Sequence, residues 1–154
     1  KGQKVLRFYF NSKGILFYEK ERGTIHPKTV IPTDVGNTKT GSDQVIKLLG
    51  EKVMDFPKPT SLIEFLIKTV SQDYGDLILD FFAGSGTTGH AVLNQNALDN
   101  KNRSFVLVQL QEQTKPESNA FKNGYDYVSK ITLARLRKLL QVLKMTLLGF
   151  SIIN

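Results

Sequence analysis

The fold is decided by the stretch Asp76-Leu-Ile-Leu-Asp-Phe-Phe-Ala-Gly-Ser-Gly-Thr-Thr-Gly-His90. Leu77 to Leu79 form an apolar run without alternation, which is typical of a strand buried on both faces of a parallel sheet. The residues Gly84-Ser85-Gly86 then predict a tight turn in which backbone can approach a ligand closely. Thr87 to Leu98 reads as a helix whose first N–H groups face the strand end. These segments predict the opening of a nucleotide-type site at the carboxyl edge of a sheet.

The glycine turn by itself fits more than one kind of site. Gly84, Gly86 and Gly89 satisfy the G-x-G-x-x-G spacing of a nicotinamide or flavin site, and a purely structural turn also stays open. Against the dinucleotide site, two aromatic residues separate the strand from the glycines, and the stretch lies in the middle of the chain. The lysine of a phosphate-binding P-loop is missing, because residue 87 is Thr87.

The residues around the turn resemble a known motif. Phe82-Ala83-Gly84-Ser85-Gly86 is similar to motif I, Phe-x-Gly-x-Gly, of the S-adenosylmethionine-dependent methyltransferases that act on amino groups in DNA. With its flanks, the run looks more narrowly like the modification subunits of type III restriction–modification systems, over roughly residues 31 to 145. The resemblance implies S-adenosylmethionine as the cofactor. The residues that it places around the cofactor in this stretch are Asp80, Phe82, Ala83, Gly84, Ser85, Gly86 and Thr87.

A second motif precedes motif I by about twenty-five residues. In Phe56-Pro-Lys-Pro-Thr-Ser61 the two prolines favour an extended approach to a helix, and Ser61 with Glu64 predicts a capping box. An apolar face on this helix is predicted at Ile63, Leu66, Ile67 and Val70. An ordinary capped helix explains these features if motif I is set aside. The resemblance instead implies motif X, Lys-Pro-x-x-Leu, matched by Lys58, Pro59 and Leu62, with Lys58 and Pro59 at the methionine end of the cofactor.

A second buried strand is predicted from Ser104 to Val108, ending at Gln109. Nucleotide-type sites usually place Asp or Glu here, because a carboxylate can accept hydrogen bonds from both ribose hydroxyls. The side-chain carbonyl of Gln109 can accept from only one, and Glu112 follows three residues later. A Val-Gln-x-x-Glu run in this place is similar to type III subunits, so Gln109 is the candidate ribose contact.

The first fifty residues predict a hairpin, a linker and a short helix. Lys4 to Phe10 and Ile15 to Lys20 are aromatic-rich strands. We expect one face of this hairpin to pack on the core, and stacking of its aromatic side chains on bases is the alternative. Gly23 to Thr40 reads as a loop. Ser42 is predicted to cap a helix from Asp43 to Leu49 that ends at Gly50.

The last forty residues predict one long helix. Thr114 to Gly124 reads as a loop, Tyr125 to Met145 as the helix, and Phe150 to Ile153 as a final strand. A stripe that faces the core or forms a homodimer seam is predicted at Leu133, Leu136, Leu140, Leu143 and Leu147. A basic face, solvated or in contact with phosphates, is predicted at Lys130, Arg137 and Lys144. Neither His26 nor His90 has a neighbour pattern for metal binding or for a nucleophile.

Composition narrows the function classes. The net charge of +7 and pI near 9.6 suit a polyanion, although a basic solvated surface explains them as well. The chain has no cysteine, which excludes disulfides, thiolate metal sites and a cysteine nucleophile. No apolar run is long enough to span a bilayer and no signal peptide is visible, so we expect a cytoplasmic protein without membrane contact.

One motif of the amino-methyltransferases is missing from the chain. Their (Asp/Asn/Ser)-Pro-Pro-(Tyr/Phe/Trp) tetrapeptide holds the target amine and grips the flipped-out base. The prolines here stand at positions 27, 32, 57, 59 and 116, and no two adjoin. We therefore expect no catalytic residue and no turnover by this chain alone. It reads as a carboxyl-terminal part of a modification subunit, with residues 1–40 as hairpin and linker from the recognition region and residues 41–154 as the cofactor-binding half.

These observations predict an α/β fold: a partial Rossmann-like methyltransferase fold with an N-terminal antiparallel hairpin. The expected parent activity is methyl transfer from S-adenosylmethionine to adenine N6 in double-stranded DNA, with a restriction subunit as a partner and a homodimer as an option. The adenine target rests on the type III resemblance alone. The alternatives are a non-catalytic fragment that binds DNA or another subunit, a cytosine-N4 methyltransferase, and a nicotinamide-dependent oxidoreductase.

Overall fold

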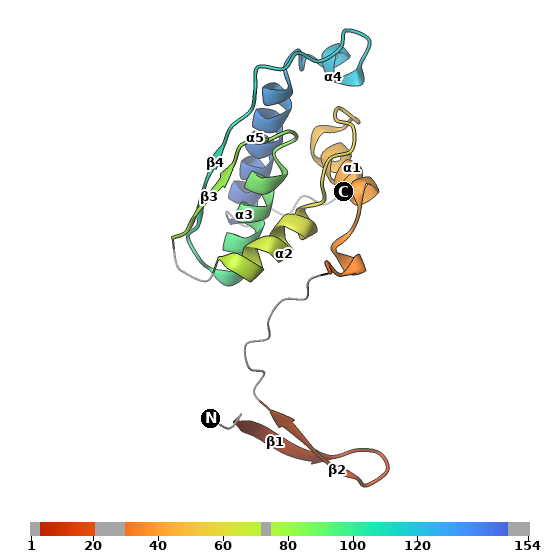
Figure 1. The fold of residues 1–154 in the computed structure, drawn as a ribbon, viewed down its shortest axis with the longest axis vertical. Coiled ribbons are helices and arrows are strands. Elements are labelled where there is room, and N and C mark those ends of the chain that lie inside the picture. Colours follow the sequence, from red (N-terminus) through yellow and green to blue (C-terminus); the bar gives the residue numbers. More distant parts are fainter. Residues whose placement is uncertain (1–3, 21–29, 72–74, 148–154) are drawn as a thin grey trace. The chain divides into compact units, whose positions relative to one another are not determined.

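A computed structural model describes residues 4–20, 30–71 and 75–147, which form two units divided between Ile31 and Pro32 (Figure 1). The first unit holds strands β1 (Val5–Phe10) and β2 (Leu16–Lys20). The second unit contains, in chain order, η1 (Thr33–Val35), α1 (Thr38–Leu49), α2 (Thr60–Val70), β3 (Leu77–Asp80), α3 (Thr87–Asp99), β4 (Ser104–Leu107), α4 (Asn119–Lys122) and α5 (Val128–Leu147).

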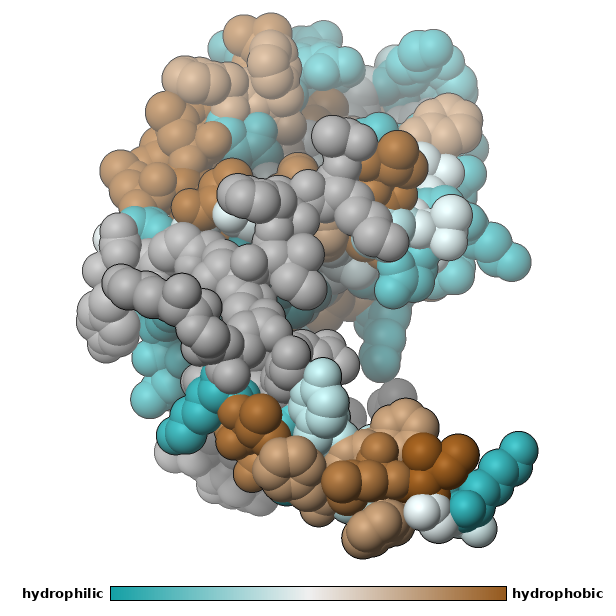
Figure 2. Space-filling model, turned by 60° about the horizontal axis from the view of Figure 1, so that its bottom comes forward, coloured by the Kyte–Doolittle hydropathy of each residue, from teal (hydrophilic) through white to brown (hydrophobic). Residues whose placement is uncertain are grey.

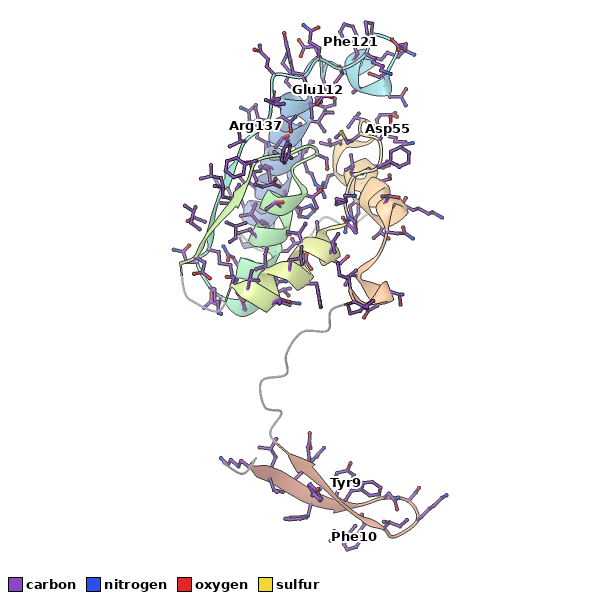
Figure 3. The ribbon with its side chains drawn as sticks, viewed as in Figure 1. Tyr9, Phe10, Asp55, Glu112, Phe121 and Arg137 are labelled. Atoms are coloured by element: carbon purple, nitrogen blue, oxygen red, sulfur yellow. The ribbon has the colours of Figure 1, made fainter. Side chains whose placement is uncertain are left out.

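The first unit is the predicted antiparallel hairpin. Cross-strand ring pairs join Phe8 to Tyr18 and Tyr9 to Phe17, with centroids 6.2 and 6.0 Å apart. Tyr9 and Phe10 point to opposite faces (Figure 3), and the hairpin carries hydrophobic side chains on its surface (Figure 2). The described side chains of both strands are exposed, so the predicted packing of one hairpin face on a core is not found within this unit. Stacking on bases stays a prediction.

In the second unit, β3 and β4 pair in parallel, as the sequence predicts, with Leu79 opposite Val106. The prediction that these strands are buried on both faces is wrong for the described residues. Ile78 and Phe105 pack into the core beneath α2 and α3, whereas Leu79 is 51% exposed. The reason is that α3 packs against β4, and α2 and α5 pack against α3, so these helices cover only one face of the two-stranded sheet.

Helix α1 begins earlier than predicted. Asn37, not Ser42, is the N-cap: its Oδ1 accepts from the N–H groups of Lys39 and Thr40 at 3.0 and 3.2 Å. The predicted end of the helix at Gly50 is confirmed. Gly50 adopts a left-handed conformation, and its N–H donates to a carbonyl of the last helical turn. Gly41 therefore lies inside the helix, where it is buried.

Helix α2 is capped from another helix. The predicted capping box of Ser61 and Glu64 is wrong, since no side chain of its own segment caps α2. The amide of Gln44 on α1 takes this place: its Oε1 accepts from the Thr60 N–H and its Nε2 donates to the Thr60 hydroxyl, both at 3.0 Å. Ser61 instead donates to the carbonyl of Val35. Of the predicted apolar face, Ile67 is buried and Ile63 packs against the core, whereas Leu66 and Val70 are exposed.

Helix α5 matches the predicted core-facing stripe only in part: Leu136 and Leu143 are half-buried, and the stripe as a dimer seam stays a prediction. The buried side chains are Val128, Ile131, Thr132, Arg135 and Leu139, whereas Leu133 and Leu140 of the predicted stripe are about half exposed. Both sets fit helical spacing, and only packing decides between them. The predicted loop from Thr114 also contains α4, whose N-terminus Ser118 caps.

The core consists of two clusters. One joins α1, the segment between α1 and α2, α4 and α5 through Val45, Val53, Ala120 and Ile131. The other joins α2 and α3 through Ile67, Ala91 and Val92. No helix of the described part is long and apolar enough to cross a membrane, and this part contains no cluster of metal-binding side chains. His26, the strand at 150–153 and the side chain of Leu147 lie outside the described residues.

Candidate functional site

The loop between β3 and α3 is held by the carboxylate of Asp80. Its Oδ1 accepts from the N–H of Phe82 at 2.9 Å, and its Oδ2 accepts from the hydroxyl of Thr88 at 2.5 Å. Asp80 thus ties the end of β3 to both sides of the loop. Gly84 and Gly86 adopt left-handed conformations, with φ of 52° and 77°, which favour glycine. Their predicted role in a tight turn is confirmed.

Gln109 lies at the end of the neighbouring strand and contacts the same loop. Its Oε1 accepts from the N–H of Gly84 at 2.7 Å, and the carbonyl of Val108 accepts from the N–H of Ala83 at 3.0 Å. The loop is therefore fastened across the carboxyl edge of the sheet. The oxygen that the sequence assigned to a ribose hydroxyl faces a backbone amide in this structure.

The segment around Lys58 reaches the loop from the other side. The Thr87 hydroxyl donates to the carbonyl of Lys58 at 3.1 Å, while the side chain of Lys58 is exposed and Pro59 is fully buried. Gly41 makes this approach possible, because a Cβ there would lie 2.1 Å from the carbonyl oxygen of Pro57. The two predicted motifs are thus neighbours in space.

Two residues of α5 also hold the loop, and the sequence analysis missed both. The hydroxyl of Thr132 donates to the carbonyl of Gly84 at 2.6 Å. Nη1 of Arg135 donates to the Ser85 and Thr87 hydroxyls, each at 3.0 Å. Polar residues in a leucine-rich helix gave no local signal. Their spacing with Val128 and Ile131 on one helical face is visible only once the packed face is known.

His90 in the first turns of α3 also contacts Arg135. Nε of Arg135 donates to its Nδ1 at 3.2 Å, which makes Nδ1 the acceptor. Burial and the neighbouring positive charge lower the pKa of His90 to about 4, and burial lowers the pKa of Arg135 to about 10. At neutral pH the imidazole is therefore neutral and the guanidinium charged.

The outer side of the loop is open. Phe82 is 82% exposed beside the glycines, and a Cβ built at Gly84 would meet nothing closer than the Cε of Met54 at 3.6 Å. Met54 lines an adjoining cavity of about 290 Å³ with Lys52, Val53, Asp55, Glu117, Ser118, Asn119 and Ala120. Asp55 and Glu112 lie toward the same end of this unit, near α4 (Figure 3). An open backbone cradle, an exposed ring and acidic neighbours suit a ligand with aromatic, hydroxyl and amino groups.

A second cavity, of about 470 Å³, lies among α1, α2, α3 and α5 and is lined by Gln44, Lys47, Leu48, Thr60, His90, Asn94 and Val142. None of the predicted site residues lines it. The structure instead brings every one of them together around the β3–α3 loop: Asp80, the run from Phe82 to Thr87, Gln109 at the strand end, and the Lys58-Pro59 segment.

A family model described as DNA methylase matches residues 18–120. The chain is 37% identical over 112 residues to the type III restriction-modification enzyme StyLTI Mod subunit of Salmonella typhimurium, covering 73% of this chain and 17% of that protein. It is 35% identical over 127 residues to the EcoPI Mod subunit of Escherichia phage P1, covering 79% of this chain and 20% of the relative.

A third relative belongs to another type of system. The type II methyltransferase M.KpnI of Klebsiella pneumoniae is 34% identical over 131 residues, covering 82% of this chain and 31% of that protein. The chain thus spans between about a sixth and a third of the length of these three relatives.

Proposed function

We propose that this chain, which belongs to the DNA methylase family, is the S-adenosylmethionine-binding part of a type III modification subunit. The observation that carries the proposal is the meeting of three segments at one sheet edge: the glycine loop, Gln109 and the carbonyl of Lys58. We further propose that β3, α3 and β4 form the central part of a Rossmann-like sheet, because a parallel pair joined by a crossover helix is its repeating unit.

In this proposal the chain's own residues bind and orient the cofactor. The first N–H groups of α3 and the charge of Lys58 attract the carboxylate of its methionine end. Phe82 covers an apolar side of the ligand. The amide Nε2 of Gln109 can donate to a ribose oxygen while its Oε1 still accepts the hydrogen bond from the N–H of Gly84. S-adenosylmethionine, when bound, supplies an activated methyl group, so the protein mainly contributes orientation.

The proposed target is the N6 amine of adenine in double-stranded DNA, because two of the relatives reported above are type III Mod subunits. Residues 1–40 are proposed as hairpin and linker from a recognition region, and residues 41–154 as the cofactor-binding half. A restriction subunit is the proposed partner, with a homodimer as the alternative assembly. Without adjoining prolines in the chain, we propose that it does not methylate DNA by itself.

Ligand-induced stabilisation tests the cofactor. We expect S-adenosylhomocysteine to raise the unfolding midpoint in scanning fluorimetry, by a free energy of about 2.7 kcal/mol at one hundred times its dissociation constant. NAD should give no shift, since Gln109 offers no carboxylate for both ribose hydroxyls. A shift with NAD and none with S-adenosylhomocysteine would refute the methyltransferase assignment.

A non-catalytic DNA- or subunit-binding role is the second candidate, favoured by the absence of adjoining prolines. Transfer of tritiated methyl groups to unmethylated DNA separates the two. We expect no transfer by the chain alone, and transfer when a polypeptide with the missing tetrapeptide and recognition region of a type III subunit is added. Transfer by the chain alone would mean that the catalytic residues are wrongly placed. No transfer from an associated pair would favour the binding role.

A further inference from the structure

Two arginines of the second unit are buried, and they differ in their partners. Arg103 is 4% exposed and forms an ion pair with Asp99 at 2.7 Å. Arg135 is 0% exposed, yet no carboxylate of residues 4–20, 30–71 and 75–147 lies within 4.0 Å of its guanidinium. A buried charge without a counter-charge is costly, because water no longer solvates it. A residue of this kind calls for a role beyond packing.

The partners of Arg135 are all neutral and all belong to the glycine loop or to the turn after it. Nη1 donates to the hydroxyls of Ser85 and Thr87 at 3.0 Å and lies 3.4 Å from the carbonyl of Ser85. Nε and Nη2 lie 3.2 and 3.1 Å from Nδ1 of His90. Arg135 on α5 thus contacts both the glycine loop, at Ser85 and Thr87, and the first turns of α3, at His90.

No described carboxylate thus forms an ion pair with Arg135, and the carboxylate of the site, Asp80, binds the loop at Phe82 and Thr88 instead. His90 does not add a second charge, because its pKa of about 4 keeps it neutral at physiological pH. The N-terminus of α3, which carries the positive end of the helix dipole, lies at Gly86 in this loop and has no side-chain cap. The Gly84–Thr87 loop, defined by these residues, is thus backed by one full positive charge and one helix N-terminus. A negative group on the open side of the loop would compensate both.

We propose that Arg135 is the positioning residue of the Gly84–Thr87 loop and that its charge makes the loop prefer ligands with a carboxylate. The inference rests on the proposed function in one respect: S-adenosylmethionine and S-adenosylhomocysteine carry an amino-acid carboxylate, whereas 5′-methylthioadenosine has the same nucleoside and sulfur without it. Arg135 does not touch the ligand. It acts through Ser85 and Thr87, which it holds in place.

The test compares two ligands and three variants of the 154-residue chain. Arg135→Met removes the charge and keeps an unbranched side chain, and Arg135→Lys keeps the charge but loses the planar fork. Arg137→Met is the matched control, since Arg137 lies on the same helix, is exposed and carries the same charge (Figure 3). Dissociation constants for S-adenosylhomocysteine and 5′-methylthioadenosine are measured by calorimetry, and amide hydrogen exchange is followed at residues 84–87.

We expect Arg135→Met to reduce the preference for S-adenosylhomocysteine over 5′-methylthioadenosine by about tenfold or more. The preference should persist in Arg135→Lys and in Arg137→Met. Hydrogen exchange at residues 84–87 should accelerate in Arg135→Met without ligand, while the control exchanges like the natural chain.

Several results would overturn the inference. An unchanged ligand preference in Arg135→Met would refute the role of the charge, and unchanged exchange would refute the positioning role. If the natural chain binds neither ligand, the proposed function fails instead, and the exchange measurement alone decides whether Arg135 positions the loop. If Arg135→Met does not fold, Arg135→Lys decides: it keeps the charge, so a lost ligand preference in that variant, with unchanged hydrogen exchange at residues 84–87, refutes the role of the charge.

Discussion

Replacing Gly41 with alanine should destabilise the protein, although helix propensity predicts the opposite. Gly41 lies inside α1, where alanine is favoured over glycine by about 1 kcal/mol. A Cβ at this position, however, would lie 2.1 Å from the carbonyl oxygen of Pro57, about 1.3 Å short of the 3.4 Å at which ordinary contact begins. Moving backbone by this distance is overpacking, which costs about 1–3 kcal/mol.

The net effect of Gly41→Ala should therefore be a loss of up to about 2 kcal/mol in the free energy of unfolding, measured by urea denaturation. Asp43→Ala, an exposed substitution in the same helix, reports propensity alone and should stay within about 0.5 kcal/mol of the natural chain. Because Lys58 follows Pro57 and accepts a hydrogen bond from Thr87, Gly41→Ala should also weaken stabilisation by S-adenosylhomocysteine. A stabilised Gly41→Ala variant would refute the close approach of the two segments.

Three other expectations follow from the site. Gly86→Val should lose about 1–3 kcal/mol of unfolding free energy in urea, because Gly86 has φ of 77° and its Cβ would lie 3.2 Å from the Cγ2 of Thr132; full stability would contradict the packing of the loop. Gln109→Leu should lose about 1 kcal/mol by leaving the N–H of Gly84 unpaired, whereas Gln109→Glu should lose less, and equal losses would count against the hydrogen bond. Between pH 6.5 and 4 the unfolded chain binds a proton that folded His90, with a pKa of about 4, does not, so acidification should remove up to about 3 kcal/mol of stability. His90→Asn should flatten that part of the pH profile, and an unchanged profile would place the pKa elsewhere.

Local patterns predicted the elements around the site. The turn residues between two aromatic runs predicted the hairpin. The apolar run before Gly84 predicted β3 and its place in a parallel sheet, where it pairs with β4. These features depend on a few adjacent residues, whose conformational preferences are strong enough to be expressed in any fold. The side-chain hydrogen bonds at the start of α2 were less predictable. Ser61 and Gln44 can each form hydrogen bonds with several groups, and tertiary packing determines which of these groups lie within reach.

The sequence by itself determined the glycine loop, its flanking strand and helix, the Lys58-Pro59 segment and the DNA methylase family. Each of these depends on residues that are adjacent in the sequence. Tertiary structure alone decided that Gln109 faces the N–H of Gly84 and that Arg135 is buried behind the loop. Arg135 is separated from Ser85 by fifty residues, and its helix offered a leucine stripe that fitted the same period. The face of a helix that becomes buried is fixed by the elements that pack against it, so it cannot be read from the spacing of that helix alone.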